Sequence, residues 1–376
     1  MEARVQENIL GMIPANVDLP SSGERGRLAE RLQRAKHAFV TRRVELSACH
    51  DLARKTAPGS GDLVLATVTK LGHHSRLENI AGRRSQLYVG DEIVVAYGAR
   101  YAPDQFEAVV PNALEPCHLV AGGGIAAWVQ ARHSSTRKPT EITPVGLLLN
   151  AKGSALNLRQ FALPAAPERR PARSVLAVVG TSMNAGKTTL AASLIRGLTS
   201  AGVRVGACKL TGTGSGGDVW SMIDAGAVRA LDFTDVGYST TAGAAIVELS
   251  KAAGVLISHL ECGNIDVVIA EIADGLFQRE TAALLDAPSP LCARIDGIFL
   301  AAADSMGAYA GVKWLRERNL LLRAVSGLLT ASPLATREAQ LATRVQVVSP
   351  RRLANPNCAV KFALQSGVPR PMSMIS

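Results

Sequence analysis

Hydrophobic and polar positions follow two different patterns along the chain, and the pattern changes near residue 174. Beyond that point, short runs of consecutive apolar residues alternate with segments whose apolar residues recur every three or four positions. Consecutive apolar runs are typical of strands buried on both faces of a parallel sheet, and the longer spacing is typical of amphipathic helices. The pattern therefore predicts an α/β domain with a mostly parallel, doubly wound sheet.

The expected strands and helices of this domain alternate regularly. Strands are expected at 175–179, 203–208, 266–272, 297–302 and 322–328. Helices are expected at 188–201, 247–260, 306–318 and 334–342. Open sheets of this kind bind ligands beyond the carboxyl ends of their strands, so functional residues are expected there.

The first half of the chain has a helix-like segment followed by short strand-like runs. Residues 21–55 carry apolar side chains at helical spacing behind two candidate N-caps, Ser21 and Ser22, and predict a long helix with an arginine-rich outer face. The strand-like runs lie at 63–68, 84–89, 92–98 and 106–111. Their short length and the Gly-Asp turns between them predict a small β-barrel. His73-His74 falls at an expected turn without carboxylates or thiolates at ligand spacing, so no metal site is expected there.

These patterns divide the chain into five segments. They are an N-terminal helical segment at 1–58, a small β-barrel-like domain at 59–120, a connecting region with a Pro-, Ala- and Arg-rich linker at 121–172, a nucleotide-binding domain at 173–350, and a basic tail at 351–376. A chain of 376 residues is long enough for two or three such domains.

Composition narrows the class of protein. Hydrophobic residues at 47% and charged residues at 19% predict a well-cored protein, and no apolar run reaches the roughly 18 residues that a membrane span needs. The N-terminus lacks the basic start and apolar stretch of a signal peptide. The six cysteines are scattered and form no CxxC pair, which favours reduced thiols. We therefore expect a cytoplasmic protein with no membrane partner.

The net charge of +10 is unevenly distributed. Residues 1–172 carry 22 Lys and Arg against 16 Asp and Glu, whereas residues 173–350 carry 15 of each. The last 26 residues add four basic side chains and no acidic one. This surplus leaves nucleic acid open as a partner. An aromatic content of only 4% offers few side chains on which bases could stack.

The strand expected at 175–179 runs into the stretch GTSMNAGKTT and then into a helix. Its two glycines permit tight turns, Lys187 can reach a nucleotide's β- and γ-phosphates, and the Thr188 hydroxyl can bind Mg²⁺. A helix N-terminus adds backbone amides and a dipole that favours negative charge. Five residues separate the glycines, one more than in the usual phosphate loop. The residues expected to bind the nucleotide are Gly180, Thr181, Ser182, Asn184, Ala185, Gly186, Lys187, Thr188 and Thr189.

Further charged residues follow the next expected strands. Glu271 stands at the end of a buried strand, and Asp218 follows a glycine-rich loop. Mg²⁺ prefers oxygen ligands and usually takes one or two carboxylates in addition to phosphates, so the metal is expected on Thr188, Asp218 and Glu271. Asp232 and Asp235 are alternatives to Asp218. The catalytic residues expected are Lys187, Lys209 and Glu271, with Lys209 as a second cation.

The stretches around these residues resemble one family of ATPases. The Gly-Thr-x4-Gly-Lys-Thr spelling is similar to the loop of dethiobiotin synthetase and the related cobyrinic acid amidases. The stretch ACKLTGTGSGGD at 207–218 resembles that enzyme's Lys-Pro-Val-x-Ser/Thr-Gly segment, with Lys209 at its second functional lysine. DVVIAEIADGLF at 266–277 resembles its Val-Glu-Gly-Ala-Gly-Gly segment. The resemblance covers about residues 174–345.

The resemblance implies an enzyme that uses Mg²⁺ and ATP to activate a small carboxylate or carbamate by phosphoryl transfer. We expect a small-molecule substrate and a homo-oligomeric assembly. Two alternatives remain. A more distant resemblance to D-amino-acid N-acetyltransferases, which combine a similar loop with a barrel-like N-terminal domain, implies that the loop would hold a coenzyme's phosphates. In the other alternative, the nucleotide regulates a module that binds nucleic acid or protein.

Overall fold

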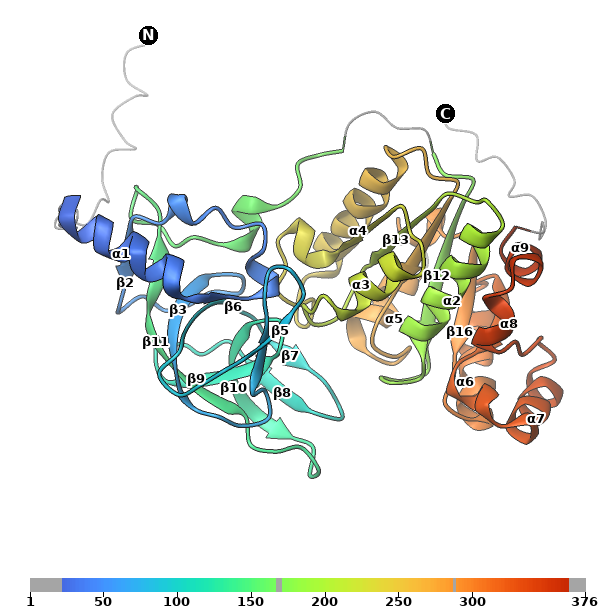
Figure 1. Ribbon diagram of the computed structural model, residues 1–376. Helices are drawn as coiled ribbons and strands as arrows, with labels where there is room; N and C mark the ends of the chain where they lie inside the picture. The colour runs from blue at the N-terminus through green and yellow to red at the C-terminus, as the bar shows by residue number, and fades with distance from the viewer. Residues whose placement is uncertain (1–21, 167–170, 287–288, 365–376) are drawn as a thin grey trace, which may run out of the picture.

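The computed structural model describes residues 22–166, 171–286 and 289–364 (Figure 1). A β-barrel forms the first half, and a layered α/β domain forms the second. Within these described ranges, no helix is long and apolar enough to cross a membrane. All six cysteines are free thiols.

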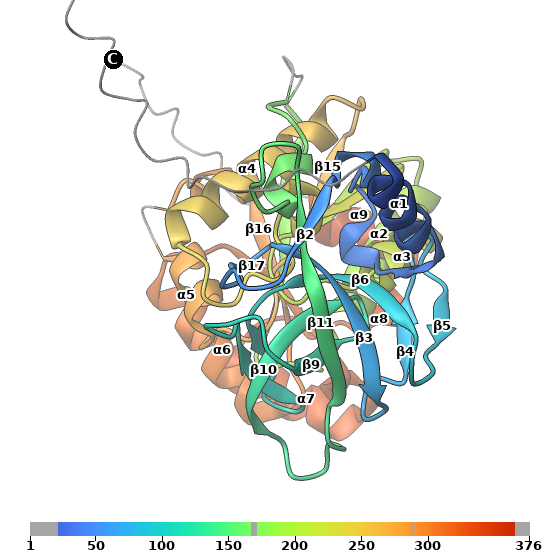
Figure 2. The ribbon, with the colours of Figure 1, turned by 90° about the vertical axis from the view of Figure 1, so that its left-hand side faces the viewer.

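Five strands of the first half close into a ring (Figure 2). In order around the ring they are β6 (Glu92–Tyr97), β3 (Leu63–Lys70), β11 (Thr140–Leu149), β9 (Cys117–Ala121) and β10 (Ile125–Arg132). The closing pair β10–β6 is parallel, and the other four pairs are antiparallel. Closure removes the exposed strand edges that an open sheet would have, and the inward side chains form one apolar core.

Shorter elements surround this ring. They are α1 (Ser22–Arg34), β1 (Lys36–His37), β2 (Asp51–Ala53), β4 (Arg76–Glu78), β5 (Arg84–Gln86), β7 (Arg100–Tyr101), β8 (Phe106–Val109) and the 3-10 helices η1 (Phe39–Thr41), η2 (Leu46–Ala48) and η3 (Leu158–Phe161).

The expected barrel is present, but it extends further along the chain than the pattern suggested. Strands β10 and β11 lie in the segment 121–172, which was expected to connect the two domains. The single long helix expected at 21–55 is wrong. Helix α1 ends at Arg34, and Lys36–His37 then pairs with β6, so strand pairing overrides the helical spacing of the following apolar residues. Residues 1–21 lie outside the described part.

The α/β domain is built on a six-stranded sheet. Its order is β14 (Arg229–Asp232), β13 (Val205–Lys209), β15 (Val267–Glu271), β12 (Ser174–Gly180), β16 (Gly297–Ala301) and β17 (Leu322–Ser326). All five pairings are parallel. The expected α/β class is therefore confirmed. Strand β14 was not expected, because its four residues are partly polar and too short to show a pattern.

Helices cover both faces of this sheet. On one face lie α2 (Lys187–Ser200), α3 (Gly217–Asp224), α8 (Pro350–Leu353) and α9 (Pro356–Leu364). On the other lie α4 (Ile246–Glu261), α5 (Arg279–Leu285), α6 (Ser305–Glu317) and α7 (Pro333–Thr343). The remaining short turns are η4 (Phe233–Val236), η5 (Cys292–Arg294) and η6 (Leu328–Ala331). Alternate residues of β12 enter the two apolar cores, as expected of a strand buried on both sides.

The segment 351–376, expected as a separate basic tail, is partly folded onto the domain. Helices α8 and α9 pack on α2 and bury Leu353 and Ala359. Gly197 permits this close approach, because a Cβ there would lie 2.2 Å from the Leu353 carbonyl oxygen. Residues 365–376 lie outside the described part.

A cluster of charged residues joins the barrel to the α/β domain. The Arg42 guanidinium, just after η1, lies 2.8 Å from Asp235 Oδ1 and 3.1 Å from Asp232 Oδ1. The same guanidinium stacks on the Phe39 ring. Both carboxylates are buried at the start of η4. Burial raises the pKa of Asp235, and the charge of Arg42 opposes that rise.

Removing this arginine is expected to destabilise the protein strongly. Arg42→Ala leaves the buried Asp232 without its cation and Asp235 with only the more distant Arg43, at 3.9 Å, and should lower the free energy of unfolding by about 3 kcal/mol. Arg34→Ala, on the exposed side of α1, is the control and should change it by less than about 0.5 kcal/mol. Urea unfolding monitored by circular dichroism measures both. Equal effects of the two substitutions would contradict a stabilising role for this cluster.

Candidate functional site

The glycine-rich loop lies between the end of β12 and the start of α2. The Thr181 amide donates to the Ala301 carbonyl at 2.9 Å, which ties the loop to the neighbouring strand β16. Gly186 has a φ of 98°, a left-handed conformation that glycine adopts without strain. Gly180 lies under the side chain of Lys187, because a Cβ there would be 2.8 Å from Lys187 Cγ. The first amides of α2 have no acceptor within the helix and point toward the loop.

Lys187 folds back over this loop. Its Nζ donates to the Ser182 carbonyl at 2.8 Å and to the Asp274 carbonyl. Only 6% of the residue is exposed. Burial lowers the pKa of Lys187, and the charges of Glu271 and Asp274 oppose that effect. The lysine therefore spans the loop at the place where a strand-to-helix turn binds phosphate.

The Thr188 hydroxyl lies between two carboxylates. Its Oγ1 is 2.9 Å from Asp218 Oδ1 and 3.3 Å from Glu271 Oε1. A hydroxyl has one proton, so it can donate to only one of the two at a time. Lys209, at the end of β13, forms an ion pair with Asp218. The structure thus brings together the three residues expected to bind the metal, Thr188, Asp218 and Glu271, and places Lys209, the expected second cation, beside them.

The donor set here suits a hard divalent cation. Glu271 is 1% exposed, and its Oε2 has no hydrogen-bond partner among the described residues. Burial, followed by the nearby charge of Asp218, raises the pKa of Glu271 to about 7. A cation bound beside Glu271, Asp218 and the Thr188 hydroxyl would offset the cost of this buried carboxylate. Within the described ranges, no cluster of three or more His, Cys, Asp or Glu side chains forms a metal site of its own.

The structure separates the two alternative aspartates from this site. Asp232 and Asp235 face Arg42 at the contact between barrel and α/β domain. Asp218 alone among the three candidates contacts Thr188 and Lys209. Of the remaining loop residues, Ser182, Asn184 and Thr189 are exposed, whereas Ala185 is buried.

The barrel contributes residues that sequence reasoning did not connect to the loop. Asn184 Nδ2, in the loop, donates to Asp104 of the turn between β7 and β8. On the α/β side, Asp274, which follows β15, accepts from Lys187 through its carbonyl. Asp274 and Gly275 stand where the dethiobiotin synthetase segment has a pair of glycines, whereas no local signal marks Asp104 or Arg100.

Comparison with known proteins gives the following matches. No family model matches the chain, and no curated protein matches its sequence. The crystal structure of signal recognition particle 54 kDa protein from Aeropyrum pernix K1 in complex with GDP is 19% identical with a TM-score of 0.35, and the match covers 50% of this chain and 44% of that one. A ParA family ATPase from Chlorobium tepidum TLS is 11% identical with a TM-score of 0.33, covering 52% and 93%. Cell division protein FtsY from Thermotoga maritima is 17% identical with a TM-score of 0.33, covering 55% and 72%.

The local geometry has the features of a phosphate-binding loop on a parallel sheet. A glycine-rich loop follows a central strand, and a lysine and a threonine occupy the first two positions of the next helix. The second half is therefore an α/β P-loop domain.

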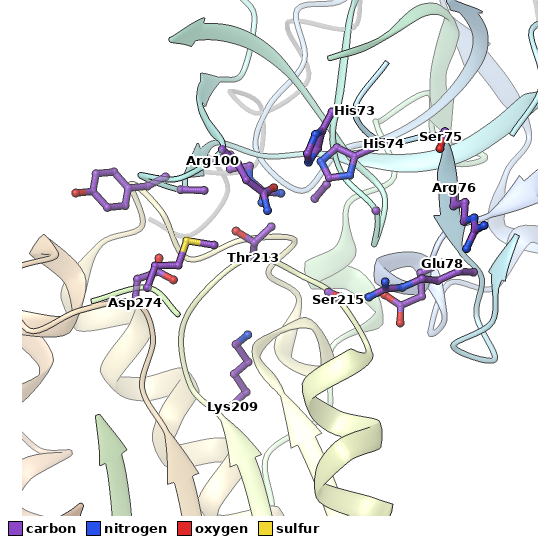
Figure 3. A pocket seen from close by; sticks show the side chains of 17 residues that line it. His73, His74, Ser75, Arg76, Glu78, Arg100, Lys209, Thr213, Ser215 and Asp274 are labelled. Carbon is purple, nitrogen blue, oxygen red and sulfur yellow. Dashed lines mark hydrogen bonds between the residues drawn. The ribbon is translucent and has the colours of Figure 1, made fainter. Parts of the chain in front are cut away.

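A cavity of about 460 Å³ lies between this domain and the barrel (Figure 3). His73, His74 and Arg100 line it from the barrel side, and Lys209 and Asp274 line it from the α/β side.

The His74 Nε2 lies 2.9 Å from the Val120 carbonyl, which requires a proton on that nitrogen. Burial and the charge of Arg100 lower the pKa of His74 to about 3. The pKa of His73 is lowered by burial and by Arg137 and Arg100. Both imidazoles are neutral at pH 7.

The neutral state of His74 should be visible in the pH dependence of stability. The unfolded imidazole takes up a proton as pH falls below its ordinary pKa of 6.5, whereas the folded one resists until about pH 3. The free energy of unfolding therefore falls progressively as pH drops through this window, and this loss is absent above it. His74→Gln keeps a donor for Val120 and should lose less stability than the wild type between pH 7 and about pH 5. Thermal unfolding of the wild type and of His74→Gln at both pH values measures the difference. Equal losses of stability in the two proteins would contradict a neutral, buried His74.

Proposed function

We propose that the loop at 180–189 binds Mg²⁺ and ATP, and that the protein uses them to activate a small carboxylate or carbamate by phosphoryl transfer, as dethiobiotin-synthetase-like enzymes do. One observation supports this more than any other. Lys187, the Thr188 hydroxyl, Asp218 and Glu271 converge beyond the carboxyl ends of adjacent parallel strands, at a helix N-terminus. That is where open α/β sheets bind nucleotides.

Each residue has a distinct task in this proposal. Loop amides and Lys187 hold the β- and γ-phosphates, and Thr188, Asp218 and Glu271 hold Mg²⁺. Bound Mg²⁺ would neutralise charge that develops on the phosphate oxygens. Lys209 adds a second positive charge on the side that faces the cavity.

The transfer itself needs no nucleophile from the protein. An oxygen of the substrate carboxylate attacks the γ-phosphorus, the bond from that phosphorus to the bridging oxygen of ADP breaks, and ADP leaves with the bonding electrons. The product is a mixed anhydride of carboxylate and phosphate. Catalysis of this kind depends on positioning and on charge stabilisation, which Lys187 and Lys209 would provide.

A second candidate is favoured by the two histidines. His73 and His74 carry neutral imidazoles that line a cavity beside the loop. A neutral imidazole can accept a proton from an attacking amine. If the loop held the phosphates of an acyl coenzyme, the same cavity would suit transfer of the acyl group to that amine, with cleavage of the thioester carbon–sulfur bond and release of the coenzyme as its thiolate.

The nucleic-acid alternative receives less support. Of the arginines on the N-terminal segment, Arg31 pairs with Glu92 and Arg42 pairs with Asp232 and Asp235. These ion pairs neutralise, within the protein, part of the positive charge on which the nucleic-acid alternative is based.

Loss of the loop lysine should abolish nucleotide binding. Lys187→Ala is expected to weaken binding of Mg-ATP by about a hundredfold, because it removes a charge-assisted contact to phosphate. A thermal-shift panel with ATP, GTP and acetyl-CoA measures ligand choice and the effect of the substitution together. Lys313→Ala, an exposed lysine on α6, is the control and should behave as the wild type does. Stabilisation by acetyl-CoA alone would favour the second candidate, and ATP binding by Lys187→Ala equal to the wild type would refute the role of the loop.

Carboxylate activation can be trapped chemically. Hydroxylamine converts the mixed anhydride to a hydroxamate, which forms a coloured complex with ferric iron. With Mg-ATP and a mixture of small carboxylates, the wild type should produce hydroxamate, and omission of ATP or Mg²⁺ should abolish it. Lys209→Ala should lower the rate by about a hundredfold, because it removes charge stabilisation at the transferring group. ATP binding without any hydroxamate would exclude carboxylate activation while leaving the nucleotide site intact.

A further inference from the structure

We propose that the cavity between the barrel and the α/β domain is a binding site for a small molecule with a free carboxylate, and that arginines of the barrel recognise this carboxylate. The inference rests on the proposed function in one respect: the ligand is the second substrate of the reaction at the phosphate loop. It adds where that substrate binds and which residues select it.

The cavity is built jointly by the two halves of the chain. Its volume of about 460 Å³ lies within the range of small-molecule sites. In Figure 3 the barrel side chains lie above and to the right of the cavity, while Lys209 and Asp274 approach it from the strand ends of the α/β domain. The charged and imidazole side chains that line it are His73, His74, Arg76, Glu78, Arg84, Arg100, Lys209 and Asp274.

The charges of the lining favour an anion. Four cationic side chains face two carboxylates, and both histidines are neutral. Glu78 Oε2 is already occupied, because it accepts from Ser215 Oγ at 2.9 Å and from the Gly216 amide at 3.0 Å. Arg76 and Arg84 are exposed to the cavity and have no ion pair or hydrogen bond from their guanidinium groups within the described ranges. A cationic ligand would meet repulsion here, whereas a carboxylate would find partners.

Arg100 supplies the second, independent indication of an anion. It is 7% exposed, and its Nη1 and Nη2 donate to the Val120 carbonyl at 2.5 Å and to Gln105 Oε1 at 2.6 Å. Its Nε has no partner among the described residues, and no carboxylate there lies within ion-pair distance. Burial lowers the pKa of Arg100 to about 10, and the charges of Asp274 and Asp104 oppose that effect only in part. A buried guanidinium whose hydrogen bonds go only to neutral acceptors and whose Nε is unpartnered is costly, and an anionic ligand that contacts it would offset that cost.

The cavity also shares a wall with the phosphate loop. Met183 of the loop lines it, and so does Lys209, whose partner Asp218 accepts from the Thr188 hydroxyl. Asp274 lines it as well, and its carbonyl accepts from Lys187. A molecule bound in the cavity therefore lies beside the residues that would hold the nucleotide. Group transfer requires such adjacency, because the two reactants must be held next to each other.

Calorimetric titration with defined carboxylates tests the site. The probes are succinate, glutarate and citrate, with succinamide as an uncharged match for succinate, each titrated into the full chain with and without Mg²⁺ and a non-hydrolysable ATP analogue. At least one carboxylate should bind, and succinamide should not. Arg76→Gln and Arg84→Gln should each weaken that binding by about tenfold, since each removes a charge-assisted contact. Arg83→Gln, an exposed neighbour outside the cavity lining, should leave it unchanged.

The outcomes separate this inference from the proposed function. Binding of the ATP analogue without binding of any carboxylate, or carboxylate binding that is unaffected by both cavity substitutions, would overturn the inference and leave the nucleotide site standing. Carboxylate binding that depends on Arg76 and Arg84, in a protein that does not bind the ATP analogue, would uphold the cavity and reject the function proposed for the loop.

Discussion

Two lysines and two carboxylates balance one another at the carboxyl ends of the central strands, and the site depends on this balance. Lys187, Lys209 and Glu271 are each less than a tenth exposed. Burial acts to lower the pKa of Lys209, but the charges of Asp218 and Glu271 outweigh it, so the net pKa is raised. Burial acts to raise the pKa of Asp218, and Lys209 outweighs it in the opposite direction. Buried charges of one sign would be too costly alone, so the fold must bring both signs together.

The barrel completes this site instead of standing apart from it. It contacts the loop through Asp104 and Asn184, and it is fastened to the α/β domain by Arg42 against Asp232 and Asp235. These contacts place Arg100 and the two histidines opposite the strand ends. The barrel thus forms the second wall of the space in which a substrate would meet the nucleotide.

The sequence predicts the α/β half well, because its signals are local. Apolar runs mark five of the six parallel strands, and the glycine-rich loop marks the turn into α2. The grouping of Thr188, Asp218 and Glu271 could be anticipated, since residues at the carboxyl ends of parallel strands meet at one edge. The end of α1 at Arg34 could not, because it is decided by pairing of β1 with the distant strand β6. The cavity could not be predicted either, because it depends on contacts between distant parts of the chain. Arg100 and Asp274 are far apart in the sequence, and only the packing of the two halves brings them together.

The most direct test of the account is a crystal structure of the protein grown with Mg²⁺ and a non-hydrolysable ATP analogue. The account predicts that the phosphates lie against the backbone of residues 180–188 with Lys187 turned toward them, and that the cation contacts the Thr188 hydroxyl, Asp218 and Glu271. A nucleotide bound elsewhere on the chain, or a cation that contacts none of these three residues, would contradict it.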